Sequence, residues 1–164
     1  MRMNGIFYFS STGNSLYLAK RAREKMGGQI RYIPRYTGDG SEYEKILLVS
    51  PVYSFGLPTP VYELLLRLEG TIPLYILLNY GGMAGGADRL AWELAKKHGK
   101  DVRGVYKLKM PENYTLTLST PAAYNRAVLK KAGPGLERIL CRRFASGGGK
   151  ELLLCSLRFT QKSL

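Results

Sequence analysis

A run of six small polar residues, Ser10-Ser11-Thr12-Gly13-Asn14-Ser15, offers the clearest chemistry in this sequence. It supplies four hydroxyl groups, one amide and one glycine, and it carries no charge. An apolar stretch from Gly5 to Phe9 precedes the run, and a stretch with helical spacing follows it. Hydroxyl groups, backbone N–H groups and the positive end of a helix dipole all favour a bound phosphate. The sequence therefore predicts a neutral phosphate-binding loop between a first strand and a first helix.

Other phosphate-binding loops fit this run less well. A nucleotide-hydrolysing loop needs the pattern G-x-x-x-x-G-K-[ST], and a dinucleotide fingerprint needs three glycines where only Gly13 is present. A phosphatase would need a nucleophile here, and the two cysteines lie far away, at Cys141 and Cys155. One simpler interpretation stays open, in which Thr12 or Asn14 only caps the helix.

The elements that must position this loop alternate between strand and helix patterns. Apolar runs predict buried strands over 3–9, 45–50 and 74–78, a short strand over 29–33 and a strand nearer the sheet edge over 101–110. Helical spacing predicts helices over 15–26, 58–68, 85–98 and 121–145, the third with Leu90-Ala91 and Leu94-Ala95 facing inward. In the last helix Gly133-Pro134-Gly135 is expected to cause an interruption or a late start. This alternation predicts an α/β fold, a three-layer, doubly wound, open parallel sheet.

In such sheets, ligands bind beyond the carboxyl ends of the strands, where the strand order reverses. The loops 10–15, 50–57 and 79–86 each follow a predicted strand, so we expect them to converge on one site. The length of 164 residues fits a single domain over 1–145, followed by a tail over 146–164 whose structure the sequence leaves uncertain.

The net charge is +13, and nine Lys and Arg residues against two Glu residues lie from Arg126 onward. Such a field attracts anionic partners. An acidic protein is the favoured partner class, because the basic residues follow no nucleic-acid reader motif, and a merely solvated basic face remains the alternative. No apolar run approaches the roughly 20 residues that span a bilayer, so no membrane contact and a cytoplasmic location are expected. No spacing of His, Cys, Asp or Glu predicts a metal site.

The segment Phe7–Ser15 resembles the phosphate loop of flavodoxins. The resemblance is closest to the flavodoxin-like half of bacterial proteins that join such a domain to a ferredoxin with two four-iron clusters, and it covers about residues 3–140. Three later segments share it: 51–58 (PVYSFGLP), 79–82 (NYGG) and 110–114 (MPENY). The resemblance implies a flavodoxin-like fold with about five strands in the order 2-1-3-4-5, and non-covalently bound flavin mononucleotide (FMN).

The resemblance also implies the residues of an FMN site, with no catalytic residue and no metal. The phosphate would be held by Ser10, Ser11, Thr12, Gly13, Asn14 and Ser15. The isoalloxazine ring would be bracketed by two loops, Pro51, Val52, Tyr53, Ser54, Phe55 and Gly56 on one side and Asn79, Tyr80, Gly81 and Gly82 on the other. A flat ring needs aromatic or backbone faces to lie against, so we expect Tyr53 or Phe55, and Tyr80, to contact it. A glycine near the ring, Gly56 or the pair Gly81-Gly82, is expected to let a peptide reorient.

The function that follows is an electron carrier that shuttles electrons between redox partners, rather than an enzyme that converts a substrate. Two alternatives remain: an FMN-dependent NAD(P)H:quinone-type oxidoreductase, and a flavin-free binding module that acts through its basic surface. The cysteine motif of the fused ferredoxin is absent from this sequence, so no iron–sulfur cluster is expected. Because opposite charges steer association, the basic chain is expected to prefer an acidic electron donor such as a small ferredoxin.

Overall fold

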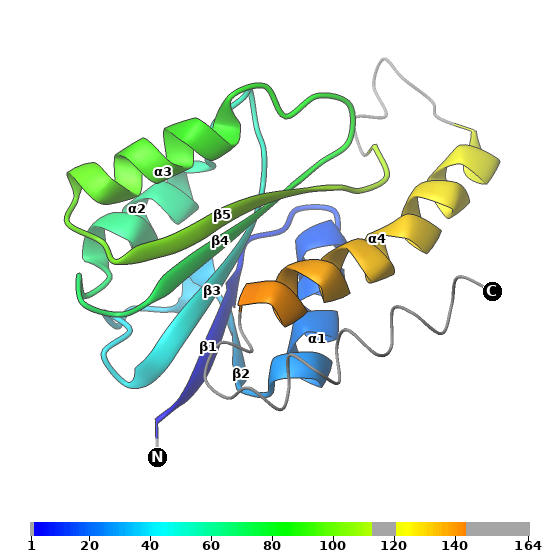
Figure 1. The fold of residues 1–164 in the computed structure, drawn as a ribbon. Helices are drawn as coiled ribbons and strands as arrows, with labels where there is room; N and C mark the ends of the chain where they lie inside the picture. The colour runs from blue at the N-terminus through cyan, green and yellow to red at the C-terminus, as the bar shows by residue number, and fades with distance from the viewer. Residues whose placement is uncertain (1, 113–120, 144–164) are drawn as a thin grey trace.

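A computed structural model describes residues 2–112 and 121–143 of the chain. Its core is a five-stranded parallel sheet in the order β2-β1-β3-β4-β5 (Figure 1). The strands are β1 (Met3–Tyr8), β2 (Gln29–Tyr32), β3 (Tyr43–Pro51), β4 (Leu74–Tyr80) and β5 (Val102–Lys109). The predicted α/β class, strand order and edge position of β5 are confirmed. The tail 146–164, Cys155, and Asn113 and Tyr114 lie outside the described residues.

Helices cover both faces of the sheet. The helices α1 (Asn14–Met26) and α4 (Ala122–Arg143) lie on one face, and α2 (Thr59–Arg67) and α3 (Ala87–Lys97) lie on the other (Figure 1). Successive residues of the central strands point to opposite faces, so Leu47 of β3 packs on the α1/α4 side and Leu48 on the α2/α3 side. A short 3-10 helix, η1 (Ile33–Arg35), follows β2 and was not predicted.

Two local expectations were wrong. The helix α4 continues without interruption through Pro134, which is exposed. Its neighbours Ala132 and Leu136 are buried against the sheet, and this packing outweighs the cost of a proline inside a helix. Leu90 was expected to point inward, but its side chain is 47% exposed, because α3 presents a stripe of three alanines to the sheet: Ala87, Ala91 and Ala95.

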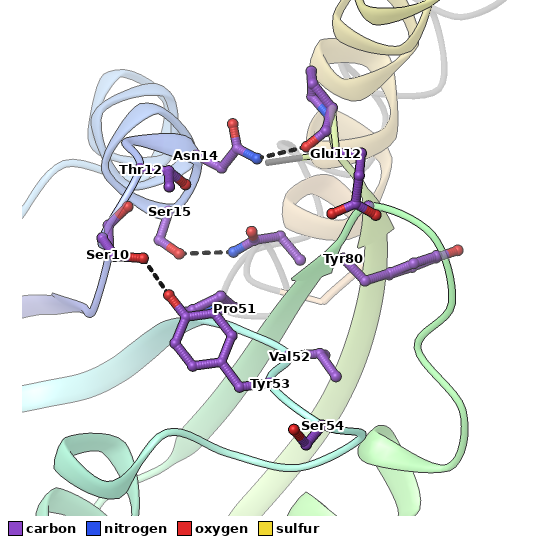
Figure 2. Close-up of a pocket in the computed structure, with 14 residues that line it drawn as sticks. Ser10, Thr12, Asn14, Ser15, Pro51, Val52, Tyr53, Ser54, Tyr80 and Glu112 are labelled. Carbon is purple, nitrogen blue, oxygen red and sulfur yellow. Dashed lines mark hydrogen bonds between the residues drawn. The ribbon is translucent and has the colours of Figure 1, made fainter. Parts of the chain in front are cut away.

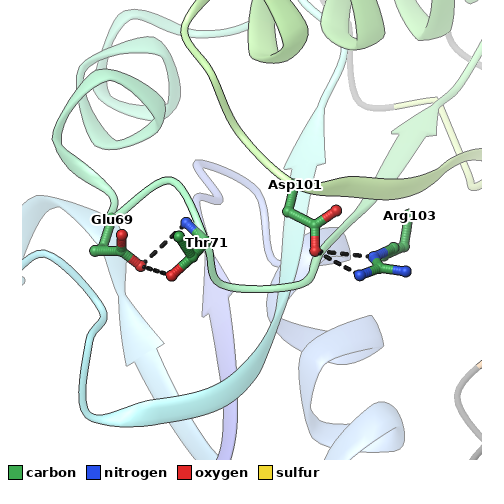
Figure 3. A network of polar contacts seen from close by, with 4 residues as sticks. All are labelled: Glu69, Thr71, Asp101 and Arg103. Carbon is green, nitrogen blue, oxygen red and sulfur yellow. Dashed lines mark hydrogen bonds and ion pairs between the residues drawn. The ribbon is translucent and has the colours of Figure 1, made fainter.

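Short turns lead from α2 into β4 and from α3 into β5 at the amino ends of these strands. Glu69 accepts hydrogen bonds from the N–H and hydroxyl groups of Thr71, and Asp101 forms an ion pair with Arg103 at 2.8 Å (Figure 3). The hydrogen bonds from Thr71 hold the pKa of Glu69 below its ordinary value. Hydrogen bonds between distant segments hold this end of the sheet as well: the Glu69 N–H donates to the Asp39 carbonyl at 2.8 Å, and the Asp101 N–H donates to the Gly70 carbonyl at 2.9 Å.

Tyr36 closes the loop between η1 and β3. Its hydroxyl donates to the Glu42 carboxylate at 2.8 Å and accepts the N–H of Gly40 at 2.8 Å, and its ring lies edge-on to Phe7 with centroids 4.7 Å apart. Burial, helped by the hydrogen bond to Glu42, raises the pKa of Tyr36 to about 12. The neutral phenol is therefore favoured in the folded state.

This pKa predicts a loss of stability at high pH. The raised pKa means that the contribution of Tyr36 is fully present below pH 10 and is lost as the pH rises from 10 to about 12. Allowing for its partial exposure, we expect a loss on the order of 1 kcal/mol. Urea unfolding from pH 9 to 12 should show this loss in the wild type and in Tyr62→Phe, and much less of it in Tyr36→Phe. Parallel pH profiles of all three proteins would contradict the assignment.

Candidate functional site

A cleft of about 440 Å³ opens at the carboxyl ends of β1, β3, β4 and β5 (Figure 2). This volume falls in the range of small-molecule sites, roughly 300–1,000 Å³. The chain leaves β1 toward one face of the sheet and β3 toward the other, so the cleft lies where the strand order reverses. The three loops expected to converge do so, and a fourth segment joins them. The lining residues are Ser10, Ser11, Thr12, Asn14, Ser15, Pro51, Val52, Tyr53, Ser54, Asn79, Tyr80, Gly81, Pro111 and Glu112.

The loop after β1 turns into α1 at Gly13. Gly13 is the N-cap residue in a left-handed conformation, with φ 100°, and its N–H donates to the Ser10 hydroxyl at 2.9 Å. The first hydrogen bond of the helix runs from the Tyr17 N–H to the Gly13 carbonyl at 2.9 Å. The N–H groups of the residues between them have no acceptor within the helix. The start of α1 thus turns backbone donors and the positive helix dipole toward the cleft.

The simpler interpretation, in which Thr12 or Asn14 is the cap, does not describe this helix start. The N-cap position belongs to Gly13, and Asn14 is the first helical residue. The Asn14 amide donates instead to the Pro111 carbonyl at 3.0 Å, across the cleft (Figure 2). This bond ties the phosphate-type loop to the segment that follows β5.

Asn79 is a buried polar junction beneath the cleft, with 3% of its surface exposed. Its side-chain amide donates to the Ser15 hydroxyl at 2.7 Å and to the Ser50 carbonyl at 3.0 Å. Its backbone carbonyl accepts the Val52 N–H at 2.9 Å. One residue at the end of β4 therefore holds the start of α1, the end of β3 and the loop that follows β3.

The loop after β3 forms a tight turn at Tyr53–Gly56. Tyr53 and Gly56 exchange backbone hydrogen bonds of 3.1 and 2.8 Å, while Ser54 and Phe55 have φ values of 48° and 62°. Two positive φ values define a type I′ turn, which normally carries Asn and Gly. Each non-glycine residue there costs about 1–2 kcal/mol. The turn directs the Tyr53 hydroxyl to the hydroxyl of Ser11, to which it is hydrogen bonded (Figure 2).

The strain at Phe55 predicts an unusual ranking of variants. Phe55→Gly and Phe55→Ala both remove the ring, but only glycine adopts a positive φ without cost. We expect Phe55→Gly to exceed Phe55→Ala in free energy of unfolding by about 1 kcal/mol, measured by urea denaturation. The same pair of substitutions at Leu90, which lies in a helix, should give the reverse order. An alanine variant at position 55 as stable as the glycine variant would show that the turn is not left-handed in solution.

Pro111 and Glu112 form the fourth wall of the cleft, and the predicted site did not include them. Of the lining residues that belong to the described ranges, Glu112 alone is charged. The segment packs tightly on the loop after β4: a Cβ added to Gly81 would lie 2.5 Å from the Glu112 carboxylate and 2.7 Å from its Cα. The signal was available, since the two residues directly follow the predicted strand 101–110.

Four residues of the predicted site do not line the cleft: Gly13, Phe55, Gly56 and Gly82. The ring of Phe55 lies against Gly85 and is 54% exposed. A Cβ at Gly56 would make only ordinary contacts, at 3.6 Å or more, so sterics do not require glycine there. In residues 2–112 and 121–143, no cluster of His, Cys, Asp or Glu could hold a metal ion, and no helix is both long and apolar enough to cross a membrane.

Solved structures that resemble this fold include flavoproteins. The Megasphaera elsdenii flavodoxin, determined in its two-electron reduced state, has a TM-score of 0.53 and 25% identity over 81% of this chain and 99% of its own. The fold is flavodoxin-like. The Fusobacterium nucleatum flavodoxin bound to FMN has a TM-score of 0.55 and 15% identity, covering 85% of this chain and 97% of its own.

The chain also resembles a solved structure that is not named a flavodoxin. General stress protein 14 from Treponema denticola, in complex with FMN, has a TM-score of 0.57 and 10% identity over 85% of this chain and 98% of its own. No protein-family model and no curated protein matches the sequence. At these identities the likeness establishes the fold, and the function has to be argued from the cleft.

Proposed function

We propose that this chain binds FMN non-covalently in the cleft and carries electrons between redox partners. The observation that supports it most is the meeting of a neutral phosphate-type loop with two tyrosine-bearing loops at the point of strand reversal. Two of the structural neighbours, the Fusobacterium flavodoxin and general stress protein 14, are complexes with FMN. The narrower kinship with the flavodoxin-like half of flavodoxin/ferredoxin fusion proteins is part of this proposal.

The phosphate end of FMN fits the loop 10–15. The hydroxyls of Ser10, Ser11 and Thr12 border the cleft, and the first N–H groups of α1 point the same way. None of these groups is charged or nucleophilically activated, which suits a phosphate that is held and not transferred. We therefore assign the phosphate to the end of the cleft formed by residues 10–15.

The ring end fits between the loops that carry Tyr53 and Tyr80. Both residues line the cleft, and aromatic side chains provide a flat surface for a flat ring. Bound FMN supplies the redox chemistry, while the protein binds it, orients it and sets the electrostatic field around it. The Glu112 carboxylate opposes the addition of negative charge in the cleft, and it therefore lowers the midpoint potential.

The partner in this proposal is a redox protein with an acidic surface, such as a small ferredoxin. The net charge of +13 supports it, because complementary charge raises association rates. Raising the salt concentration should then slow electron transfer.

Titration with FMN and with riboflavin tests the proposal directly. Calorimetry and quenching of flavin fluorescence should show FMN binding at least ten-fold more tightly than riboflavin, which lacks the phosphate. Equal affinities for FMN and riboflavin would show that the loop 10–15 does not bind the phosphate. A protein that stays colourless with FMN would favour the flavin-free module. Stopped-flow reduction of the FMN-loaded protein should be slow with NADPH alone, whereas fast reduction would favour the quinone-type oxidoreductase.

A further inference from the structure

The two helical faces of the sheet differ strongly in charge. On α1 and on α4 up to Cys141 there are eight Lys and Arg residues and two Glu residues. On α2 and α3 there are four Lys and Arg residues and three Asp and Glu residues. The two helices of the basic face lie side by side (Figure 1), and the ion pair of Lys25 with Glu137 at 3.2 Å joins them. The basic residues of this α1/α4 face are Lys20, Arg21, Arg23, Lys25, Arg126, Lys130, Lys131 and Arg138.

The carboxylates in the described part of the chain leave most of this charge uncompensated. Glu24 pairs with Arg21 at 2.9 Å, and Glu137 pairs with Lys25. Within the two described ranges, no carboxylate lies within 4 Å of the other six basic residues. The segments 113–120 and 144–164 contain one acidic side chain, Glu151, and three basic ones. They add positive charge to the chain rather than balance it.

The basic face adjoins the cleft at two places. The helix α1 starts in the loop 10–15 that lines the cleft. Near the start of α4, the ammonium group of Lys109 lies 5.6 Å from the ring centroid of Tyr124, and Pro111 lines the cleft two residues after Lys109. A partner seated on this face therefore lies beside the proposed cofactor.

We propose that the α1/α4 face is the docking surface for an acidic protein that exchanges electrons with the cleft. The inference rests on the proposed function and assigns it a surface. Complementary charge steers a protein partner and orients it toward the cleft. A single-stranded nucleic acid would need stacking platforms, and the exposed aromatic residues of these helices are only Tyr17 and Tyr124. A membrane would need an apolar helix face, but the buried residues Leu18 and Leu136 face the sheet, and Leu129 is the one large aliphatic side chain exposed on the described part of these helices.

Two matched double variants test the surface. Lys130→Glu/Lys131→Glu reverses two exposed charges on α4, and Lys96→Glu/Lys97→Glu reverses two on α3, so the change in net charge is the same. The probe is a small acidic [2Fe–2S] ferredoxin, reduced with dithionite and mixed with the FMN-loaded protein in stopped flow. At low salt we expect the α4 variant to react about ten-fold more slowly and the α3 variant to stay within about two-fold of wild type. At high salt the three rates should converge.

A second measurement separates this inference from the proposed function. Binding of the oxidised ferredoxin to the FMN-free proteins should show the same ranking, whether or not FMN binds. Failure of FMN binding in all three proteins would overturn the proposed function. Ferredoxin binding to the FMN-free proteins would still show which face of the protein the ferredoxin contacts. Equal effects of the two variants, or no effect, would overturn the assignment to the α1/α4 face. Binding to a DNA duplex or to phosphatidylserine vesicles that depends on Lys130 and Lys131, without ferredoxin binding, would overturn the partner class.

Discussion

Asn79→Ala is expected to lower the free energy of unfolding by about 3 kcal/mol and to weaken FMN binding at least ten-fold. The substitution leaves the buried Ser15 hydroxyl without its donor, and it removes the side-chain donor of the Ser50 carbonyl, which stays paired in the ladder of β3 and β4. Each buried polar group left unpaired costs about 1–3 kcal/mol. Because the same amide fixes the start of α1, the N–H donors of the loop 10–15 lose their fixed position. Urea unfolding of the FMN-free protein and FMN titration measure the two effects separately.

Asn4→Ala is the matched control for this variant. The Asn4 amide makes one hydrogen bond, to the Met26 carbonyl at 2.8 Å, near the start of β1 and away from the cleft. Loss of this hydrogen bond should lower the free energy of unfolding by about 1 kcal/mol and leave the dissociation constant of FMN unchanged. An Asn79→Ala protein that binds FMN as tightly as wild type would show that the start of α1 holds its position without this amide.

Gly81→Ala is expected to give the second large effect, a loss of about 2 kcal/mol in stability and a loss of most FMN affinity. The new Cβ would fall 2.7 Å from the Cα of Glu112, which a rotation of the glutamate side chain does not relieve. Either the loop after β4 or the segment of Pro111 and Glu112 has to shift. Both line the cleft, and the second is held by Asn14. Thermal unfolding and FMN titration provide the measurements.

Gly86→Ala controls for the loss of a glycine in the same loop. No atom lies within 4 Å of a Cβ at Gly86, and its φ of −91° suits alanine. We expect this variant to match wild type in stability and in FMN affinity. If Gly81→Ala also matched wild type, the close packing of Glu112 on Gly81 would not shape the cleft.

The sequence was sufficient to predict the sheet and the place of the cleft. Apolar runs such as Ile46–Val49 are fully buried in β3, as expected for a parallel strand covered on both faces. The alternation of strands with helices led to the doubly wound sheet, and the rule of strand reversal led to three of the four walls of the cleft. These features depend on residue patterns within short windows, and a single sequence displays them directly.

The remaining features depend on contacts between distant segments. The path of α4 through Pro134 is decided by packing of Leu136 on the sheet, and the exposure of Leu90 by the alanine stripe beneath α3. Asn79 was expected beside the ring, while its side chain turned out to be a buried junction for three segments. Residue type does not reveal which partners an amide will have. Such roles become visible only when the strands are placed side by side.

The hydrogen bonds that close the cleft join residues far apart in the chain. Asn79 and Ser15 are separated by 64 positions, and Asn14 and Pro111 by 97. A chain emerging from the ribosome therefore cannot complete the cleft until residue 111 has appeared and β5 has paired. Any cofactor in this cleft is captured late, after the sheet has assembled. Acquisition of the cofactor's colour during refolding would then report the last step of assembly, and a fragment ending before β5 would stay without it.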